Sequence, residues 1–206
     1  MLHYEIHVTV HTNEVEQFQE VCKKIGVKPI ILDLQKKSGD VLCEVMTSST
    51  ISTEDTTINT AFNAMHDVIA AMAREDFHII RGKIETVPWH PLAPKEHGGK
   101  IHFKGSHFET HFGIIIKEKG DDHRLMDIAK RHNLHLSKNV FKKFEDGSHV
   151  QMVTYRSYSM VKEDFELVVD SITREIFDFG LTMEKKPKIE FAIYDSNHSH
   201  DDKWLK

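Results

Sequence analysis

The stretch that decides the fold is residues 3–10, HYEIHVTV, because its pattern returns in residues 107–114 as HFETHFGI. Both copies contain His-x-Glu-x-His, and the second begins 104 positions after the first. Successive side chains of a β-strand point to opposite faces, so the two histidines and the glutamate of each copy share one face. The other face is mainly apolar, as packing on a core requires. The repeated stretch therefore predicts two equivalent strands, each with one ionisable face.

The elements around the two stretches follow one order. Up to residue 87, apolar periodicity and turn residues predict strand, helix, strand, strand, helix, strand, and the same order is predicted from residue 106 onward. Met46-Thr47 corresponds to Val153-Thr154 at a shift of 107, and Lys83-Ile84-Glu85 to Lys188-Ile189-Glu190 at a shift of 105. The sequence thus predicts an α+β protein that is a tandem duplication of a ferredoxin-like (βαββαβ) module, with two antiparallel sheets and pseudo-two-fold symmetry.

Three segments follow from this repeat. Residues 1–87 form the first ferredoxin-like module, residues 88–105 a connector rich in proline and glycine, and residues 106–206 the second module with a C-terminal tail.

Local signals place several element ends. Gly26 and Asn133 are expected to end corresponding helices in the left-handed conformation, and Ser52 or Thr53 is expected to begin the second helix. The segments 36–40 and 145–148 have the composition of hairpin turns.

Composition limits the class of protein. The chain has 206 residues, 39% of them hydrophobic and 29% charged, with a formal charge of -5 and no dense Lys/Arg block, which argues against non-specific binding to nucleic acid. It contains no apolar run near the roughly 20 residues of a membrane span and no signal-peptide pattern at its start, so we expect a cytoplasmic protein without a membrane partner. Sixteen histidines are an unusual number and favour metal or acid–base chemistry.

The candidate site is the ionisable face of the repeated strand and of the last strand in each module. A ferredoxin-like sheet carries both helices on one face, and its last strand lies beside the first, so the lysines and glutamates of the last strands join the open His-Glu-His faces. Two such faces turned toward each other would enclose a polar cleft. Imidazole and carboxylate groups from alternate strand positions can converge on a divalent ion such as Zn, Mn or Fe. The predicted metal ligands are His3, Glu5, His7, His107, Glu109 and His111.

The function that this pattern favours is a small-molecule enzyme, a metal-assisted hydrolase, and a phosphorylated small molecule is one option for its substrate. The ion would activate water, and a free carboxylate, Glu85 or Glu190, would carry a proton. The predicted catalytic residues are His7, His111, Glu85 and Glu190.

Two other functions stay open. The segment Ile6-His7-Val8-Thr9-Val10 resembles one half of the 2H phosphoesterase pattern, in which two His-x-Ser/Thr strands act as general base and general acid without a metal. The second copy reads His111-Phe112-Gly113 and lacks the hydroxyl. The second is a non-catalytic module that binds an anion or metabolite. The face could also have no function and be a solvated sheet face whose His and Glu residues pair with each other.

Some other polar residues are weaker candidates. His90 beside Trp89 and the run from His198 to Asp202 could supply metal ligands, although connectors and termini collect polar residues without function. Arg156 and Lys138 could bind an anion, although isolated basic residues are more often surface charges.

Overall fold

The protein has a mixed α+β fold with one antiparallel sheet and four helices within the residues that the structure, a computed structural model, describes: 1–35, 41–99 and 102–200. The expected turn at residues 36–40 lies outside this range. In the first half, the elements are β1 (Leu2–His11), α1 (Val15–Ile25), β2 (Lys28–Gln35), β3 (Val41–Thr53), α2 (Asn59–Arg74) and β4 (His78–Thr86). In the second half, they are β5 (His107–Ile116), α3 (Lys119–His132), β6 (His135–Lys143), β7 (His149–Ser157), α4 (Lys162–Asp178), β8 (Thr182–Met183) and β9 (Ile189–Asp195).

The strands of the two halves pair in the same way. In the first half the order is β2-β3-β1-β4, and in the second it is β6-β7-β5-β9, with the short β8 also beside β5. Each half therefore has the strand order of a ferredoxin-like unit, with its first strand between the third and the last.

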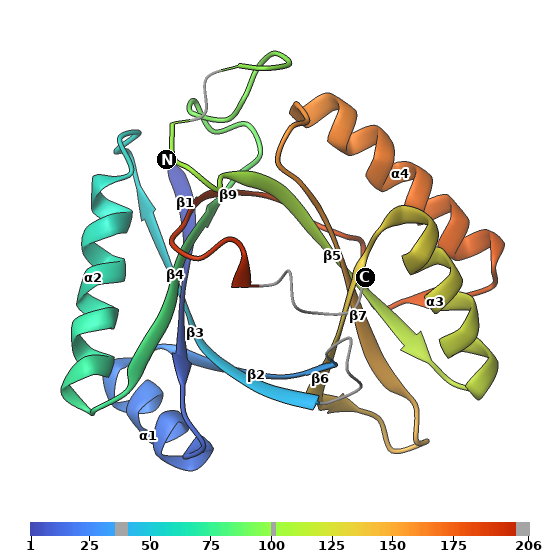
Figure 1. Cartoon of the computed structure of the whole chain (residues 1–206), viewed down its shortest axis with the longest axis horizontal. Coiled ribbons are helices and arrows are strands. Elements are labelled where there is room, and N and C mark those ends of the chain that lie inside the picture. Colours follow the sequence, from blue (N-terminus) through green and yellow to red (C-terminus); the bar gives the residue numbers. More distant parts are fainter. Residues whose placement is uncertain (36–40, 100–101, 201–206) are drawn as a thin grey trace.

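The two separate sheets expected from the sequence are a single nine-stranded sheet. Strand β2 pairs antiparallel with β6, and β4 pairs antiparallel with β9, so all strands except β8 form a closed ring (Figure 1). The physical reason is that separate sheets would each leave two edge strands with unpaired N–H and C=O groups, whereas ring closure pairs them. The register shifts by one residue at Ile80 of β4, which bulges opposite β1, and at Ile193 of β9, which bulges opposite β4; both bulges help the strands to curve.

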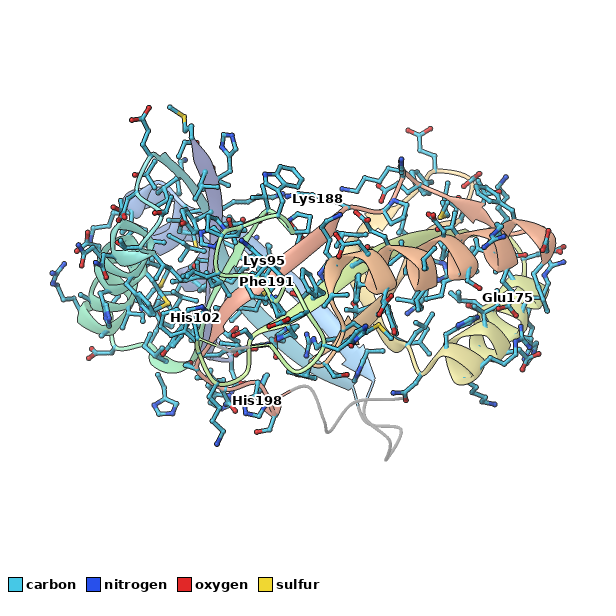
Figure 2. All side chains as sticks on the ribbon, turned by 90° about the horizontal axis from the view of Figure 1, so that it is seen from above. Lys95, His102, Glu175, Lys188, Phe191 and His198 are labelled. Atoms are coloured by element: carbon cyan, nitrogen blue, oxygen red, sulfur yellow. The ribbon has the colours of Figure 1, made fainter. Side chains whose placement is uncertain are left out.

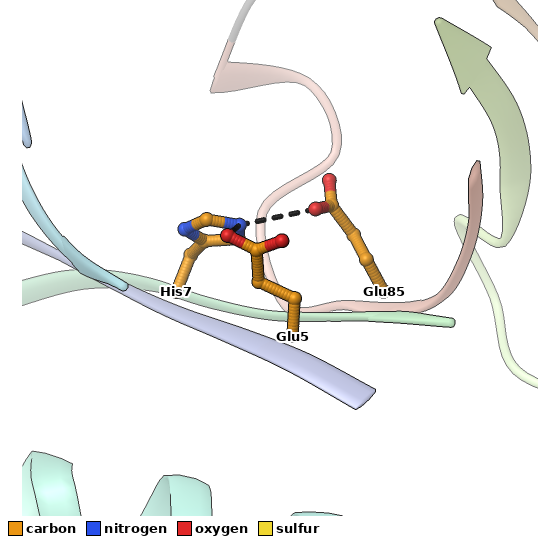
Figure 3. A group of neighbouring side chains, drawn as sticks. All are labelled: Glu5, His7 and Glu85. Carbon is orange, nitrogen blue, oxygen red and sulfur yellow. Dashed lines mark hydrogen bonds and ion pairs between the residues drawn. The ribbon is translucent and has the colours of Figure 1, made fainter. Parts of the chain in front are cut away.

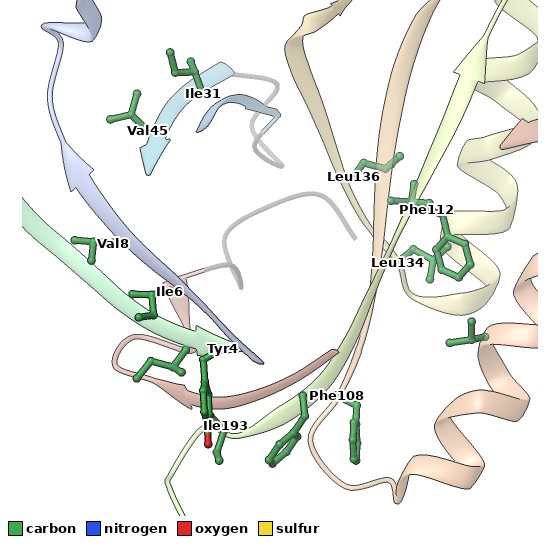
Figure 4. Close-up of a cluster of buried hydrophobic side chains, with 14 of the residues drawn as sticks. Tyr4, Ile6, Val8, Ile31, Val45, Phe108, Phe112, Leu134, Leu136 and Ile193 are labelled. Carbon is green, nitrogen blue, oxygen red and sulfur yellow. The ribbon is translucent and has the colours of Figure 1, made fainter. Parts of the chain in front are cut away.

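The helices cover the outside of this ring. Helices α1 and α2 contact strands of the first half, α3 and α4 contact strands of the second, and Figure 2 shows the two pairs at opposite sides of the molecule. The outward side chains of β1, Tyr4, Ile6 and Val8, are buried, and so is Phe108 of β5 (Figure 4). Because side chains alternate, the ionisable residues between them point into the ring.

The sequence predicts where helices end better than it predicts where they begin. Gly26 (φ 75°) and Asn133 (φ 53°) both adopt the left-handed conformation after α1 and α3, as expected. The prediction for the second helix was wrong, because Ser52 and Thr53 still belong to β3 and α2 begins at Asn59. Asp55 organises the turn between them by accepting hydrogen bonds from the backbone N–H and the hydroxyl of Thr57.

Candidate functional site

The ring encloses a cavity of about 270 Å³ that both halves line. One part of its wall is apolar and the rest is charged or polar. The apolar lining residues are Ile30, Leu32, Met46, Leu136 and Met152. The charged lining residues and histidines are Glu5, His7, Glu44, Arg81, Lys83, Glu85, His111, His135, Arg156 and Glu190.

Three of these side chains form a compact cluster on β1 and β4. Glu5 lies opposite Glu85 in the strand pairing, and His7 lies opposite Lys83. His7 Nε2 is 3.0 Å from Glu85 Oε2 and 3.5 Å from Glu5 Oε1 (Figure 3). One ligand atom from each of Glu5, His7 and Glu85 lies within 4.8 Å of the other two. These residues, which we call the β1–β4 cluster, have the spacing and chemistry of a three-ligand metal site.

The protonation of His7 is set by two different partners. Its Nδ1 lies 3.2 Å from the carbonyl oxygen of Thr47, which can only accept, so Nδ1 carries a hydrogen. Nε2 therefore holds a lone pair in the neutral ring and shares a proton with Glu85 in the charged ring. Burial disfavours the imidazolium, but the charge and the hydrogen bond of Glu85 outweigh burial and raise the pKa of His7 above its usual value.

Lys83 joins this cluster to the second half of the chain. Its Nζ pairs with Glu85 Oε1 and lies 2.6 Å from Oε1 of Glu109 on β5, whose Oε2 accepts a hydrogen bond of 2.8 Å from Arg156. Burial opposes charge on all these groups, but their pairing keeps them charged: the pKa of Lys83 is raised, and those of Glu85 and Glu109 are lowered. Lys83 thus pairs with one oxygen of Glu85, Oε1, while His7 contacts the other, Oε2.

His111 on β5 is the counterpart of His7. It lies opposite Thr154 of β7, as His7 lies opposite Ser48 of β3, and its Nδ1 is 2.7 Å from Thr154 Oγ1. Burial lowers the pKa of His111, so its neutral form is favoured, the opposite of His7. Ligand atoms of His111, Glu85 and Glu109 also lie within 4.8 Å of one another, but the Lys83 ammonium already holds both carboxylates.

Glu190 is the carboxyl group whose pKa rises furthest toward neutrality. It lies opposite Glu109 in the pairing of β5 with β9, and its Oε1 accepts a hydrogen bond of 2.6 Å from Lys188. Burial and the nearby charge of Glu85 raise the pKa of Glu190 to about 7. A carboxyl group that titrates near neutral pH is suited to give and take a proton in a reaction.

The remaining predicted ligands lie outside the β1–β4 cluster. His3 is exposed, and its Nδ1 is 2.7 Å from Ser52 Oγ. His107 is buried, its Nδ1 donates to the carbonyl oxygen of Gly105, and its ring lies against Tyr158. Its Nε2 is 3.4 Å from Glu109 Oε2, and because Nδ1 already donates to Gly105, these two atoms attract each other only when the ring is protonated.

The weaker candidates have other roles. His90 is buried in the connector. Its Nδ1 accepts a hydrogen bond from the backbone N–H of Leu92, and its Nε2 lies 2.9 Å from the hydroxyl of Tyr4, so both ring nitrogens already have hydrogen-bond partners within the protein. Of the run from His198, residues 201 and 202 lie outside the described part, and so does the side chain of Lys138. Arg156 is not the surface charge that the sequence favours, because its guanidinium pairs with Glu109 inside the ring.

Sequence reasoning missed two residues that line the cavity, Arg81 and Glu44. Arg81 pairs with Asp195 of β9 through bonds of 2.8 and 2.5 Å. The alternation of side chains along β4 could have predicted that Arg81 faces the cavity, since it lies on the same face of the strand as Lys83 and Glu85. Glu44 lines the cavity although its strand carries no His-Glu-His pattern, and no local signal marks it.

Comparisons with known proteins find similarity only in structure. No protein-family model matches the chain, and neither does a curated protein. A protein described as a candidate glycine cleavage system transcriptional repressor is 7% identical, with a TM-score of 0.30 over 92% of this chain and 96% of that one. An unknown protein from Galdieria sulphuraria is 10% identical, with a TM-score of 0.28 over 92% and 98% of the chains.

A third solved structure is the siroheme decarboxylase NirDL in complex with an iron-uroporphyrin III analogue. It is 9% identical, with a TM-score of 0.31 over 93% of this chain and 72% of that one. At such low identities and scores, these likenesses carry no conclusion about function. Among the described residues, no helix is both long and apolar enough to cross a membrane.

Proposed function

We propose that this protein is a metal-assisted hydrolase of a small molecule, and that Glu5, His7 and Glu85 hold the metal ion at the cavity wall. The observation that carries the proposal is the convergence of two carboxylate oxygens and one imidazole nitrogen within 4.8 Å of one another, on side chains that line the cavity. Such a donor set suits Zn²⁺, Mn²⁺ or Fe²⁺ and leaves coordination positions for water and substrate.

The surroundings of the three side chains support this use. The Thr47 carbonyl accepts a hydrogen bond from Nδ1 of His7 and fixes the ring so that Nε2 faces the two carboxylates; metal-binding histidines commonly donate their other ring N–H in this way. Ser48 Oγ donates to Glu5 Oε1 at 2.8 Å and orients that carboxylate. Lys83 binds the other oxygen of Glu85, so Oε2 remains turned toward His7.

The chain supplies acid–base groups beside this cluster. A bound ion would lower the pKa of water and polarise a substrate oxygen. Glu190, with its pKa near 7, can take a proton from the attacking water and deliver it to a leaving group. Burial lowers the pKa of His111 and so favours its neutral form, which can accept a proton. Lys83 and Arg156 hold Glu109 so that it does not compete for the ion.

The experiment that tests this proposal is calorimetric titration of zinc and manganese into metal-free protein. Wild-type protein should bind one ion per chain, and Glu85→Gln should lose that binding because an amide is a poorer ligand than a carboxylate. Glu20→Gln, an exposed change on α1, is the matched control and should bind as wild type does.

The pH dependence of the titration adds a second readout. The ion and a proton compete for His7 Nε2, so affinity should fall as the pH drops below the raised pKa of His7, with release of a proton on binding. Equal metal binding by wild type and Glu85→Gln, or binding that ignores pH between about 5 and 8, would show that the cluster is not the metal site.

A second candidate function is acid–base catalysis without a metal. It is favoured by the opposite pKa shifts of His7 and His111, because a histidine with a raised pKa suits the acid of such a reaction and one with a lowered pKa suits the base. Thr9, two residues after His7, is buried on the same face, in keeping with the resemblance to 2H phosphoesterases, whereas the residue two positions after His111 is Gly113. Hydrolysis of a phosphodiester that survives a strong chelator would favour this function over the first.

We also propose that the two halves arose by duplication. Glu5 faces Glu85 across one strand pair, and Glu109 faces Glu190 across the corresponding pair. The two halves meet at two strand pairs, β2 with β6 and β4 with β9, which we call the seams. Each seam joins equivalent strands in antiparallel fashion, as an approximate two-fold axis requires. A homologue whose halves share clear sequence identity would support this origin, and one in which only one half has this strand order would speak against it.

A further inference from the structure

Glu44 is a buried carboxylate that the β1–β4 cluster does not explain. Only 4% of its surface is exposed, and it lines the cavity from β3. His200, in the segment that follows β9, lies 2.5 Å from Oε2, whereas Oε1 is buried and accepts no hydrogen bond from any described residue. A buried acceptor without a partner costs free energy, so a group that donates to Oε1 would stabilise the protein.

The position of Glu44 gives the cavity two polar ends. Ser48, which bonds Glu5 of the β1–β4 cluster, lies four residues further along β3 on the same face, a spacing of about 13 Å. Between them stands Met46, and Leu32 lies opposite Glu44 in the pairing of β2 with β3. An apolar stretch therefore separates Glu44 from the β1–β4 cluster.

Glu44 is also an exception to the repeat. Ser48 lies opposite His7 and Thr154 lies opposite His111, so Ser48 and Thr154 are equivalent positions. Two residues before them in the chain are Met46 and Met152. Stepping back four gives Glu44 in one half and Val150 in the other, where the valine is fully buried. Because the equivalent position is apolar, the strand pairing does not require a carboxylate there; the pair with His200 uses Oε2 and leaves Oε1 unexplained.

We infer that the cavity binds a compact molecule with an apolar body about the size of one ring and an amine at one end, and that Glu44 Oε1 accepts a hydrogen bond from this amine. A cavity of 150 Å³ suffices for benzene, so about 270 Å³ admits one substituted ring. The body would lie on Met46, Leu32 and Met152 and present its other end to the β1–β4 cluster.

Charge favours an amine over an anion at this end. Arg81 is paired with Asp195 and Arg156 with Glu109, so these cations are already neutralised within the ring. A cationic donor at Glu44 would form a charge-assisted hydrogen bond with a buried carboxylate, whereas an anion would be repelled. This inference deepens the proposed function by naming the ligand class of the same cavity, but binding through Glu44 needs no metal ion.

The test uses three probes with one ring each: phenethylamine, 2-phenylethanol and phenylacetate. Binding to metal-free, full-length protein is followed by NMR titration. Wild type should bind phenethylamine most tightly and phenylacetate most weakly. Glu44→Gln should weaken phenethylamine binding by about tenfold or more, because the charge-assisted bond is lost, while Glu44→Asp should keep the preference for the amine. The exposed Glu16→Gln on α1 is the matched control and should bind as wild type does.

Zinc titration of the same proteins separates the two proposals. Glu44→Gln should retain the zinc affinity of wild type, since Glu44 is not a member of the β1–β4 cluster. A wild-type protein that binds none of the three probes, or binds phenylacetate best, overturns the inference, and so does a Glu44→Gln variant with unchanged preference for the amine. None of these results depends on whether zinc binds.

Discussion

At the scale of single residues, the protonation of His7 makes the stability of the fold depend on pH. Its Nδ1 is held by the Thr47 carbonyl, and its Nε2 meets Glu85, so the ion pair with Glu85 forms only when the ring is protonated. Its pKa in the folded protein is raised, while the unfolded value is about 6.5. The stabilisation is therefore fully present below about pH 6.5 and is lost as the pH rises through the folded pKa.

This gives a prediction for His7→Gln in the presence of a chelator. The free energy of unfolding lost by the variant, relative to wild type, should be larger at pH 5.5 than at pH 9, because only the charged ring pairs with Glu85. Glu85 remains ionised at pH 5.5, since Lys83 lowers its pKa. Urea unfolding of both proteins at the two pH values measures the difference, and a larger loss at pH 9 would contradict the assignment.

Lys83 is the residue on which the interior charges depend most. Its ammonium lies between Glu85 and Glu109, which are 3% and 0% exposed. Lys83→Met should lower the free energy of unfolding by about 3–5 kcal/mol, because two buried carboxylates would lose their shared cation. The control is Lys24→Met, which removes a surface pair with Glu75 and should cost far less. Similar losses in the two variants, measured by urea unfolding, would refute the central role of Lys83.

The residues of the site could be predicted in part, because alternation assigns a face to each strand position. That rule brings Glu5, His7 and Glu85 together and also places Lys83 beside them. It does not tell which end of a strand the cavity reaches, so His3 lies outside it. It also gives no reason for Glu44, whose burial depends on how β3 curves across the ring.

At the scale of elements, helix ends are encoded locally. Gly26 has φ 75°, and apart from its own residue and its two chain neighbours no atom lies within 4 Å of the position that a Cβ would take. The cost of Gly26→Ala is therefore conformational, about 1–2 kcal/mol of unfolding free energy. Gly120 lies in α3, where a Cβ would meet only Glu118 at 3.8 Å, so Gly120→Ala should stabilise the protein by about 0.5–1 kcal/mol. Thermal unfolding should shift in opposite directions, and equal shifts would contradict this reasoning.

Strand register was harder to predict than strand order. The sequence match aligns Thr47 with Thr154, but pairing with β1 and β5 shows that Ser48 is the equivalent of Thr154. A slip of one residue moves every side chain to the other face, and short similar motifs do not resolve it. The order of elements survives such a slip, which is why the ferredoxin-like unit is visible in the sequence and the exact residue correspondence is not.

At the scale of the whole molecule, the two halves share one ring. The seams β2–β6 and β4–β9 and the ion pairs Arg81–Asp195 and Lys83–Glu109 all cross between halves. The closing of the ring could not be predicted, because the sequence of an edge strand does not show with which other edge strand it will pair. The halves should therefore unfold together, with one calorimetric transition whose calorimetric and van't Hoff enthalpies agree. Two resolved transitions would show that the halves are independent.

The most direct test of the central claim, that Glu5, His7 and Glu85 hold a metal ion, is anomalous diffraction at the zinc edge from a crystal grown with zinc. The account predicts one strong peak inside the ring, about 2.0–2.2 Å from His7 Nε2 and from an oxygen of each glutamate. An ordered ring without a peak in the β1–β4 cluster, with zinc only at exposed histidines such as His97, would contradict it.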